Sequence, residues 1–269
     1  MSERIRRLQP AFSGGKRRLL MCALVAGDPH VEATQKYMHI LADAGADIIE
    51  LIVPFSDPTY HGAVIQRACA RAIHEDVDWD EICAVLEGFR VRHPDTPVVV
   101  STYYNRVLAR GMDGCAKQLA EAGADAMMIT DLPWDESEAV KKAFGAHGLS
   151  IVNTVAPTTS LERFRLIAGS ATGLLVWTGH SGGELTISSE EFQRAMAEFR
   201  RHTSLPILAS MKISTGEEAA EVGRYADGVL VGSALIWLIE GRGPDIQERL
   251  RRYVLDMREH LDRSSTPSP

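Results

Sequence analysis

Residues 19–53, LLMCALVAGDPHVEATQKYMHILADAGADIIELIV, contain the strand–helix–strand pattern that decides the predicted fold. Leu19–Ala26 and Asp47–Val53 are almost continuously apolar, which is typical of parallel strands buried on both faces. Val31–Ala44, between them, has its apolar residues at helical spacing. The stretch therefore predicts two parallel strands joined by a helix.

The same alternation continues along the chain. Six further apolar runs are Pro97–Tyr103, Ala126–Ile129, Ser150–Val155, Gly173–Trp177, Pro206–Ser210 and Gly228–Val231. The helical patterns are Ile65–Ala72, Trp79–Arg92, Cys115–Ala122, Ser137–His147, Leu161–Ala168, Ser189–His202 and Glu217–Val222. Eight such units in 269 residues favour an α/β fold, a single-domain (β/α)8 TIM barrel, over a doubly wound sheet.

We predict one domain over residues 1–262. It comprises a lead-in helix at 1–17, the barrel at 18–240 and a final helix at 244–261 that covers the barrel wall. A disordered Ser/Pro tail is predicted at 263–269.

A short motif recurs before alternate strands. Ala44-Gly45-Ala46-Asp47 and Ala122-Gly123-Ala124-Asp125 are near copies, and Tyr225-Ala226-Asp227-Gly228 is a looser one. The glycines suit a left-handed helix end. These positions belong to the N-terminal rim of a barrel, where catalytic residues are not expected, so we assign them a stabilising role.

Composition excludes several classes of function. Hydrophobic residues make up 45% and charged residues 24%, as in ordinary globular proteins, and the net charge of −7 disfavours nucleic acid as a partner. Six basic residues do cluster near the N-terminus, and we interpret them as one face of a solvated helix without an assigned function: Arg4, Arg6, Arg7, Lys16, Arg17 and Arg18.

The cysteines and the apolar runs indicate a cytoplasmic protein. The four cysteines have no CxxC spacing, and we expect reduced thiols and no zinc site: Cys22, Cys69, Cys83 and Cys115. No apolar run reaches 18 residues, so no membrane span is predicted. Arg17-Arg18 and the following apolar run resemble a signal peptide, but a buried first strand followed by the Gly27-Asp28-Pro29 loop explains them better.

Active sites of such barrels lie at the C-terminal ends of the strands. Glu50 occurs there inside an apolar strand, where a carboxyl group is costly unless it is paired or titrates near neutrality. A raised pKa suits general acid–base catalysis, whereas the alternative is a side chain that points outward. Gly232-Ser233 follows the eighth strand and opens a helix, which predicts either a phosphate site or an ordinary helix cap.

Several of these segments resemble one known family. The pattern includes Glu50-Leu51 before Pro54-Phe55-Ser56-Asp57-Pro58, Gly27-Asp28-Pro29, Ile65-Gln66, Tyr103 with Asn105, Asp131-Leu132-Pro133 and Gly232-Ser233-Ala234. It extends from about Leu19 to Glu240 and is similar to the tryptophan synthase alpha chain family.

The resemblance implies a carbon–carbon lyase that uses no cofactor and no metal. It cleaves indole-3-glycerol phosphate by a retro-aldol reaction to indole and glyceraldehyde 3-phosphate. The family's partner is a chain that contains pyridoxal phosphate and consumes the indole. Matching positions imply a catalytic set of Glu50, His61 and Tyr103, substrate or phosphate contacts at Asp131, Gly183, Lys212, Gly232 and Ser233, and a partner interface at Pro54, Asp57 and Asn105.

Two matched positions depart from the family pattern. His61 stands where the family has an aspartate that accepts the indole N–H, and a neutral imidazole stabilises the protonated ring less well. Lys212 stands where a phosphate-binding glycine is expected. It could bind phosphate as a point charge, select a smaller anion, form a Schiff base or remain a solvated surface residue. The loop Thr178–Gly183 also differs, and Ala23 replaces a common aromatic residue, which implies a roomier pocket.

Three functions remain open from the sequence. The first is the indole-releasing lyase. The second is a diverged relative in specialised metabolism that makes or breaks a carbon–carbon bond on another substrate, as the changes at His61 and Lys212 would allow. The third is a non-catalytic activator of a beta-type partner.

Overall fold

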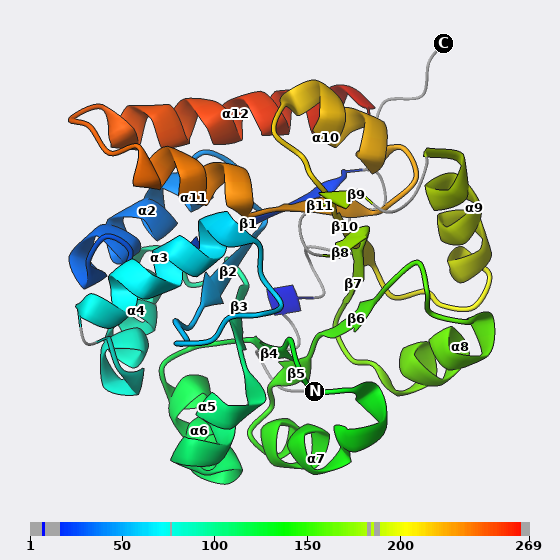
Figure 1. Ribbon diagram of the computed structural model, residues 1–269, viewed down its shortest axis with the longest axis horizontal. Helices are drawn as coiled ribbons and strands as arrows, with labels where there is room; N and C mark the ends of the chain where they lie inside the picture. The colour runs from blue at the N-terminus through cyan, green and yellow to red at the C-terminus, as the bar shows by residue number, and fades with distance from the viewer. Residues whose placement is uncertain (1–6, 9–16, 76, 182–183, 186–188, 265–269) are drawn as a thin grey trace.

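The computed structural model describes residues 7–8, 17–75, 77–181, 184–185 and 189–264. In this part of the chain, parallel strands form a ring and helices lie outside it (Figure 1). The ring contains β1 (Leu19–Val25), β2 (Ile48–Ile52), β3 (Val98–Thr102), β4 (Ala126–Ile129), β5 (Ser150–Ile151), β6 (Asn153–Val155), β7 (Leu175–Thr178), β10 (Ile207–Ser210) and β11 (Gly228–Val231). The predicted TIM barrel is confirmed.

The ring closes through the fifth predicted strand, which is divided at Val152. The strand order is β5-β4-β3-β2-β1-β11-β10-β7-β6, so β5 pairs with β4 while β6 pairs with β7. Because β5 and β6 are consecutive in the chain, the two ends of this order meet. A separate antiparallel pair, β8 (His180–Ser181) and β9 (Glu184–Leu185), follows β7.

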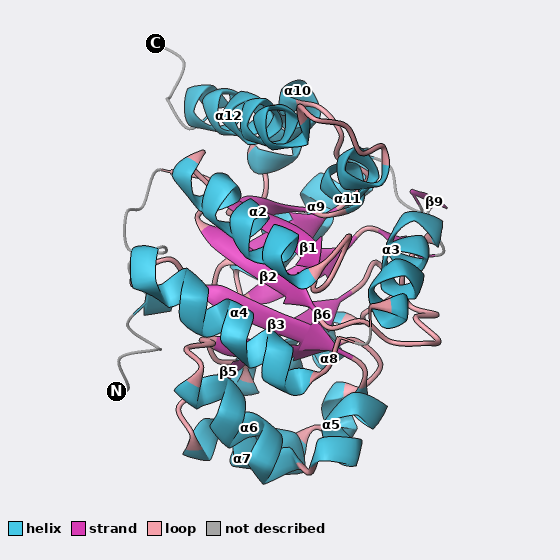
Figure 2. Cartoon of the chain, turned by 90° about the vertical axis from the view of Figure 1, so that its left-hand side faces the viewer, coloured by secondary structure: helices cyan, strands magenta, loops and turns pink. Residues whose placement is uncertain are grey.

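Helices cover the outside of the barrel, as the side view of α2, α4 and α3 against the strands shows (Figure 2). They are α2 (Val31–Asp43), α3 (Ala63–His74), α4 (Trp79–Arg92), α5 (Tyr104–Arg110), α6 (Met112–Glu121), the 3-10 turn η1 (Trp134–Glu136), α7 (Glu138–Ala146), α8 (Leu161–Ser170), α9 (Ser189–Arg200), α10 (Gly216–Gly223), α11 (Ser233–Glu240) and α12 (Ile246–Ser264).

Strand alternation divides the core into two layers. Leu20, Cys22 and Leu24 of β1 point outward and pack with residues of the surrounding helices. Met21 and Ala23 point inward and pack with Ile48 and with inward residues of the other strands. Each strand thus presents every second side chain to the barrel interior. Only these residues can contribute strand side chains to a site inside the barrel.

Some element boundaries differ from the sequence predictions. The helix α5 was not predicted. Its first backbone N–H, at Tyr104, donates to the Asp131 carboxylate at 2.7 Å, and this partner follows a different strand. The helix α12 continues through Ser264, so the predicted tail is wrong for residues 263–264, while 265–269 lie outside the described residues. The lead-in helix 1–17 also lies outside them, except for Arg7, Leu8 and Arg17.

The motif aspartates at the N-terminal rim join neighbouring strands. Asp47, Asp125 and Asp227 each accept a hydrogen bond from a backbone N–H near the start of β1, β3 or β10, at 2.8, 2.8 and 2.7 Å. Gly45 and Gly123 have φ of +106° and +98°, the left-handed conformation that the motif predicts. These contacts agree with the structural role expected of the motif.

The interpretation of the N-terminal basic cluster as solvated is wrong for Arg7. Its guanidinium binds the Asp125 carboxylate at 2.6 Å, and Arg90 of α4 binds the same fully buried carboxylate at 2.6 Å. The neighbouring Leu8 is buried with the inward-facing residues of the barrel. In Figure 1, this two-residue piece (dark blue) lies within the ring of strands. Arg7 and Leu8 therefore cover the N-terminal end of the barrel.

Two smaller findings concern the rest of the described chain. Within it, no helix is long and apolar enough to cross a membrane. Cys22, Cys69, Cys83 and Cys115 are all free thiols, as predicted.

Replacing the buried rim carboxylate will destabilise the fold. Asp125→Ala leaves Arg7 and Arg90 without their shared partner, and we expect the free energy of unfolding to fall by about 3–5 kcal/mol. The matched control is Asp43→Ala in α2, which removes the contacts of an exposed carboxylate with Arg92 and His93 at the end of α4 and should cost at most about 1 kcal/mol. Urea titrations of both variants measure the difference. Equal losses would contradict the structural role of Asp125.

Candidate active site

A cavity of about 650 Å³ opens at the C-terminal ends of the strands, where this fold places its active sites. Its floor contains inward-facing strand residues, among them Ala23, Glu50 and Leu230. Its sides come from the β2–α3 loop, the β10–α10 loop and the start of α11. The volume is within the usual range for small-molecule sites. Of the predicted site residues, Glu50, His61, Lys212, Gly232 and Ser233 all line this one cavity.

Glu50 has the environment of an acid–base group. It occupies an inward position of β2, opposite Ala23 of β1, and is only 3% exposed. Burial raises the pKa of its carboxyl group to about 7. The Ser101 hydroxyl of β3 is near enough to oppose this shift, although it makes no hydrogen bond of ordinary geometry. The outward orientation that the sequence left open is excluded.

His61 is held in place by Tyr103. The Tyr103 hydroxyl lies 3.0 Å from Nδ1 of His61 and accepts a hydrogen bond from the backbone N–H of Tyr60 at 3.0 Å. Burial lowers the pKa of His61 to about 4, so the imidazole is neutral at physiological pH. Tyr103 itself does not line the cavity, and its ring stacks on Phe55 with centroids 4.9 Å apart. Tyr103 is therefore a positioning residue for the histidine.

The start of α11 offers backbone donors to an anion. Gly232 provides no side-chain cap, so the first N–H groups of this helix have no such partner, and Gly232, Ser233 and Ala234 line the cavity. Lys212 of the β10–α10 loop lines the same cavity and is exposed. An uncapped helix start and a lysine together suit a phosphate group. The predicted contact Gly183 lies outside the described residues.

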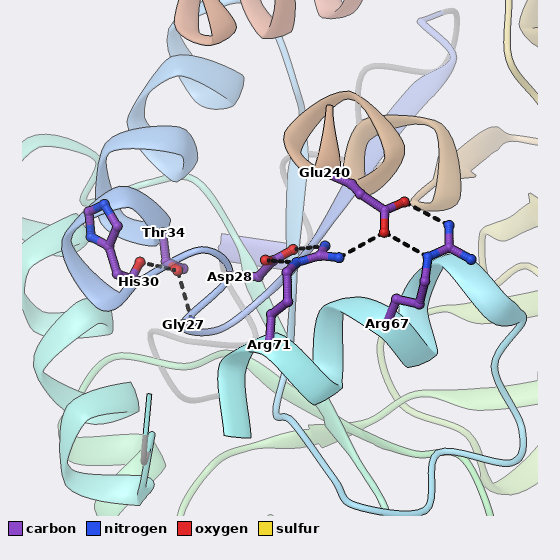
Figure 3. A network of polar contacts seen from close by, with 7 residues as sticks. All are labelled: Gly27, Asp28, His30, Thr34, Arg67, Arg71 and Glu240. Atoms are coloured by element: carbon purple, nitrogen blue, oxygen red, sulfur yellow. Dashed lines mark hydrogen bonds and ion pairs between the residues drawn. The ribbon is translucent and has the colours of Figure 1, made fainter. Parts of the chain in front are cut away.

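Ion pairs connect the helices that follow these two parts of the site (Figure 3). Arg67 of α3 makes two hydrogen bonds of 2.6 Å to Glu240 of α11. Arg71 of α3 binds Glu240 at 2.9 Å and the Asp28 carboxylate at 2.7 and 2.8 Å. The helix after the His61 loop is thus joined to the helix whose first residues offer the anion site.

The structure does not bring every predicted residue to the cavity. Asp131 is absent from the cavity lining, and its carboxylate accepts a hydrogen bond from the backbone N–H of Tyr104 at the start of α5. The residues assigned to a partner interface lie on the same rim: Asp57 and Asn105 are exposed, whereas Pro54 is buried. Pro54 can therefore act on an interface only by shaping its loop.

Sequence reasoning missed several hydroxyl groups around the mouth. Tyr60, Thr130, Thr154, Thr178 and Ser210 all line the cavity. Thr154, Thr178 and Ser210 lie in strands, and Thr130 directly follows β4. Each comes two positions after a buried inward residue, so strand alternation could have identified them. The orientation of Tyr60, in a loop, had no such signal. Among the described residues, no group of three or more His, Cys, Asp or Glu side chains could hold a metal ion.

Fold and site together define a TIM-barrel enzyme that performs acid–base chemistry on a small anionic substrate. Comparison with known proteins specifies the family. Residues 12–264 match the family model for the tryptophan synthase alpha chain. The chain belongs to this family, and the resemblance seen in its motifs is confirmed.

Individual relatives match over almost their whole length. The tryptophan synthase alpha chain of Marinobacter nauticus is 39% identical over 265 residues, which cover 96% of this chain and 98% of the relative. That of Laribacter hongkongensis is 36% identical, covering 94% and 96%. The crystal structure of tryptophan synthase subunit alpha from Legionella pneumophila str. Paris superimposes with a TM-score of 0.90 at 34% identity, covering 98% of this chain and 100% of that one.

The raised pKa of Glu50 predicts a pH dependence of stability. An exposed glutamate titrates near 4.5, whereas folded Glu50 titrates near 7, so the folded state holds an extra proton between these values. Stability contributed by this proton is complete below about pH 4.5 and is lost as pH rises through 7. Glu50→Gln abolishes the effect, so its advantage over the wild type should grow by about 3 kcal/mol across this window. Urea unfolding at pH 4.5 and 7.5 measures it, and a constant difference would contradict the raised pKa.

Proposed function

We propose that this chain cleaves indole-3-glycerol phosphate to indole and glyceraldehyde 3-phosphate. Membership of the tryptophan synthase alpha chain family supports this lyase activity. The single observation in the site that carries the proposal is Glu50, a buried carboxyl group with a pKa of about 7 at the floor of the 650 Å³ cavity at the barrel mouth.

The chemistry needs one group that first gives and then accepts a proton. Protonated Glu50 adds its proton to C3 of the indole ring, which leaves positive charge on the ring nitrogen. The Glu50 carboxylate then takes the proton of the side-chain hydroxyl as the carbonyl of the aldehyde forms. The electrons of the broken carbon–carbon bond return to the ring and neutralise the nitrogen. A pKa near the working pH makes both transfers accessible to one carboxyl group.

His61 and the start of α11 complete the proposed binding mode. His61, held by Tyr103, faces the ring, but as a neutral group it stabilises the protonated intermediate less than a carboxylate would. The phosphate lies at the backbone N–H groups after Gly232, beside Ser233 and within reach of Lys212. Gly183 remains a further proposed phosphate contact.

The resemblance also supports a partner. We propose a complex with a beta-type chain containing pyridoxal phosphate, through the exposed rim that includes Asp57 and Asn105. The four free cysteines are consistent with the cytoplasm as the proposed location.

His61 and Lys212 differ from the family pattern, and these differences support a second candidate function: carbon–carbon bond chemistry on a related substrate. A Schiff-base version is disfavoured because Lys212 is exposed, whereas Schiff-base lysines are desolvated. The non-catalytic activator is disfavoured by Glu50, since a scaffold has no use for a costly buried carboxyl group aimed into a cavity.

Indole release from indole-3-glycerol phosphate tests the proposal directly. The purified chain, with and without a beta-type chain, should release indole, and Glu50→Gln should lower kcat by about 100-fold or more because the proton donor is lost. Circular dichroism establishes that the variant is folded. No indole above background in either arm would refute the function, and full activity of Glu50→Gln would refute the mechanism.

Restoring a carboxylate beside the ring should accelerate the reaction. In His61→Asp, a charged acceptor faces the ring nitrogen in place of a neutral one. A gain of about 2–3 kcal/mol corresponds to about a 30–150-fold rise in kcat. His61→Asn, a neutral acceptor, is the matched control and should show no such rise. Similar rates for the Asp and Asn variants would show that charge at this position is not limiting.

A further inference from the structure

Arg71 joins three elements of the barrel through one guanidinium group (Figure 3). Its Nε and Nη2 atoms donate to the two carboxylate oxygens of Asp28, in the loop after β1, at 2.7 and 2.8 Å. Its remaining nitrogen, Nη1, donates to the carboxylate of Glu240 in α11 at 2.9 Å. Because Arg71 itself belongs to α3, a single planar group connects the β1 loop, α3 and α11.

A second arginine strengthens the connection between α3 and α11. Arg67 precedes Arg71 by one helical turn and donates from Nε and Nη2 to the two oxygens of Glu240, each at 2.6 Å. The hydrogen bonds from Arg67, together with the charge of Arg71, lower the pKa of the Glu240 carboxyl group to about 2. A guanidinium fork fixes the plane of its carboxylate, which a lysine ammonium group cannot do. This network of Asp28, Arg71, Glu240 and Arg67 therefore fixes orientation as well as charge.

The partners of Glu240, and not its own helix, explain why it stands where it does. It is the last residue of α11, where the negative end of the helix dipole disfavours a carboxylate, and the last turn of α11 contains no basic residue. The Asp28 carboxylate is costly by itself as well, because its side chain is only 1% exposed. Arginines of α3 stabilise both carboxylates, so α3 is the common support of the β1 loop and of α11.

The same helix holds the loop that carries His61. α3 begins at Ala63, just after the histidine, and Gln66 in its first turn donates from Nε2 to the His61 backbone carbonyl at 2.7 Å. The backbone N–H of Gln66 donates to the Gly62 carbonyl at 3.1 Å. The placement of α3 therefore determines the placement of the histidine that lines the cavity.

The helix α11 is held at both ends. Before its first residue, Gly232 lies so close to β1 that a Cβ atom added there would be 3.2 Å from the Cβ of Ala23. At its last residue, Glu240 is held by the two arginines of α3. A helix this short behaves as a rigid unit, so the direction of the N–H groups at its start depends on where Glu240 is held.

We propose that Arg71 is a positioning residue that sets the spacing between the two halves of the site, His61 at the ring side and the start of α11 at the anion side. The identity of the ligand rests on the proposed lyase function. A fixed spacing selects the length of the chain between the aromatic ring and the phosphate, which narrows the substrate class to compounds with a three-carbon connection. Binding at both ends then holds the reacting carbon atoms at Glu50.

Two variants break the network from opposite sides. Arg71→Lys keeps a positive charge beside the buried Asp28 but loses the fork that also reaches Glu240. Glu240→Gln keeps the pair of Asp28 and Arg71 and weakens the contact with α11. Arg92→Lys is the matched control, because Arg92 also pairs with a carboxylate of a neighbouring helix, but at the N-terminal end of the barrel. Circular dichroism and urea unfolding establish that the three variants are folded.

Chain length is the first measurement. Calorimetry compares indole-3-alkyl phosphates, which cannot be cleaved, with two, three and four carbon atoms in the chain. In the wild type and in Arg92→Lys, the three-carbon compound should bind about tenfold more tightly than the other two, and in both network variants this preference should fall to about threefold or less. Inorganic phosphate, which occupies only the anion side, should bind to all of these proteins within about twofold.

Two results of this measurement would overturn the positioning role. One is a three-carbon preference that survives both network variants or is missing from the wild type. The other is a loss of inorganic phosphate binding as large as the loss of alkyl phosphate binding, since Arg71 would then act on the anion side alone. A residue that only stabilises the fold would change the urea midpoint and leave the chain-length preference as it is.

The rate of indole release is the second measurement. In Arg71→Lys and Glu240→Gln, kcat should fall by about tenfold or more, because the ring is displaced from Glu50, whereas Arg92→Lys should keep the wild-type kcat. An unchanged kcat in both network variants, with indole release intact, would overturn the positioning role and leave the lyase function standing.

The alkyl phosphates also separate failure of the lyase function from failure of this inference. They bind without being cleaved, so their chain-length preference is measured whether or not the chain releases indole. If the wild type releases no indole, the lyase proposal fails, and the preference still decides the role of Arg71. If the wild type binds none of these compounds, the two sides do not form one site and the inference fails as well.

Discussion

The functional part of this structure depends on one uncompensated carboxyl group inside an apolar barrel. Glu50 is 3% exposed and has no ion-pair partner among the described residues, so burial raises its pKa to about 7 against the smaller, opposing effect of Ser101. The inward residues beneath the carboxyl group, such as Met21, Ile48 and Val99, are apolar and buried, and their packing stabilises the barrel around it. In the proposed reaction, His61 faces the ring and the start of α11 binds the anion.

The two ends of the barrel separate stability from chemistry. At the N-terminal rim, carboxylates such as Asp125 are fully paired with arginines and backbone N–H groups, so each charge is satisfied. At the C-terminal mouth, Glu50 lacks a partner and the first N–H groups of α11 lack a side-chain cap. Unsatisfied groups at one end are available to a substrate, which is consistent with the proposed lyase reaction.

Much of the fold and part of the site could be predicted from the sequence. Apolar runs and helical periods gave the barrel, because burial on both faces of a parallel strand requires continuous apolar residues. A carboxyl group inside an apolar strand indicated Glu50, and position after the eighth strand indicated Gly232 and Ser233. The contact of the Asp131 carboxylate with the first N–H of α5 could not be predicted, because Tyr104 and Asp131 follow different strands. Arg7 was misassigned because its partner, Asp125, is 118 residues away.

The sequence by itself determined the family, the eight-unit barrel, the rim motifs and the identity of the buried glutamate, since these follow from local periodicity and contiguous motifs. Only the tertiary structure decided that Tyr103 holds His61, that hydroxyl groups of several strands line the mouth, and that Arg67 and Arg71 join α3 to α11. The physical reason is that side chains in loops, and partners far apart in the chain, meet only when the barrel closes and brings opposite strands to one cavity.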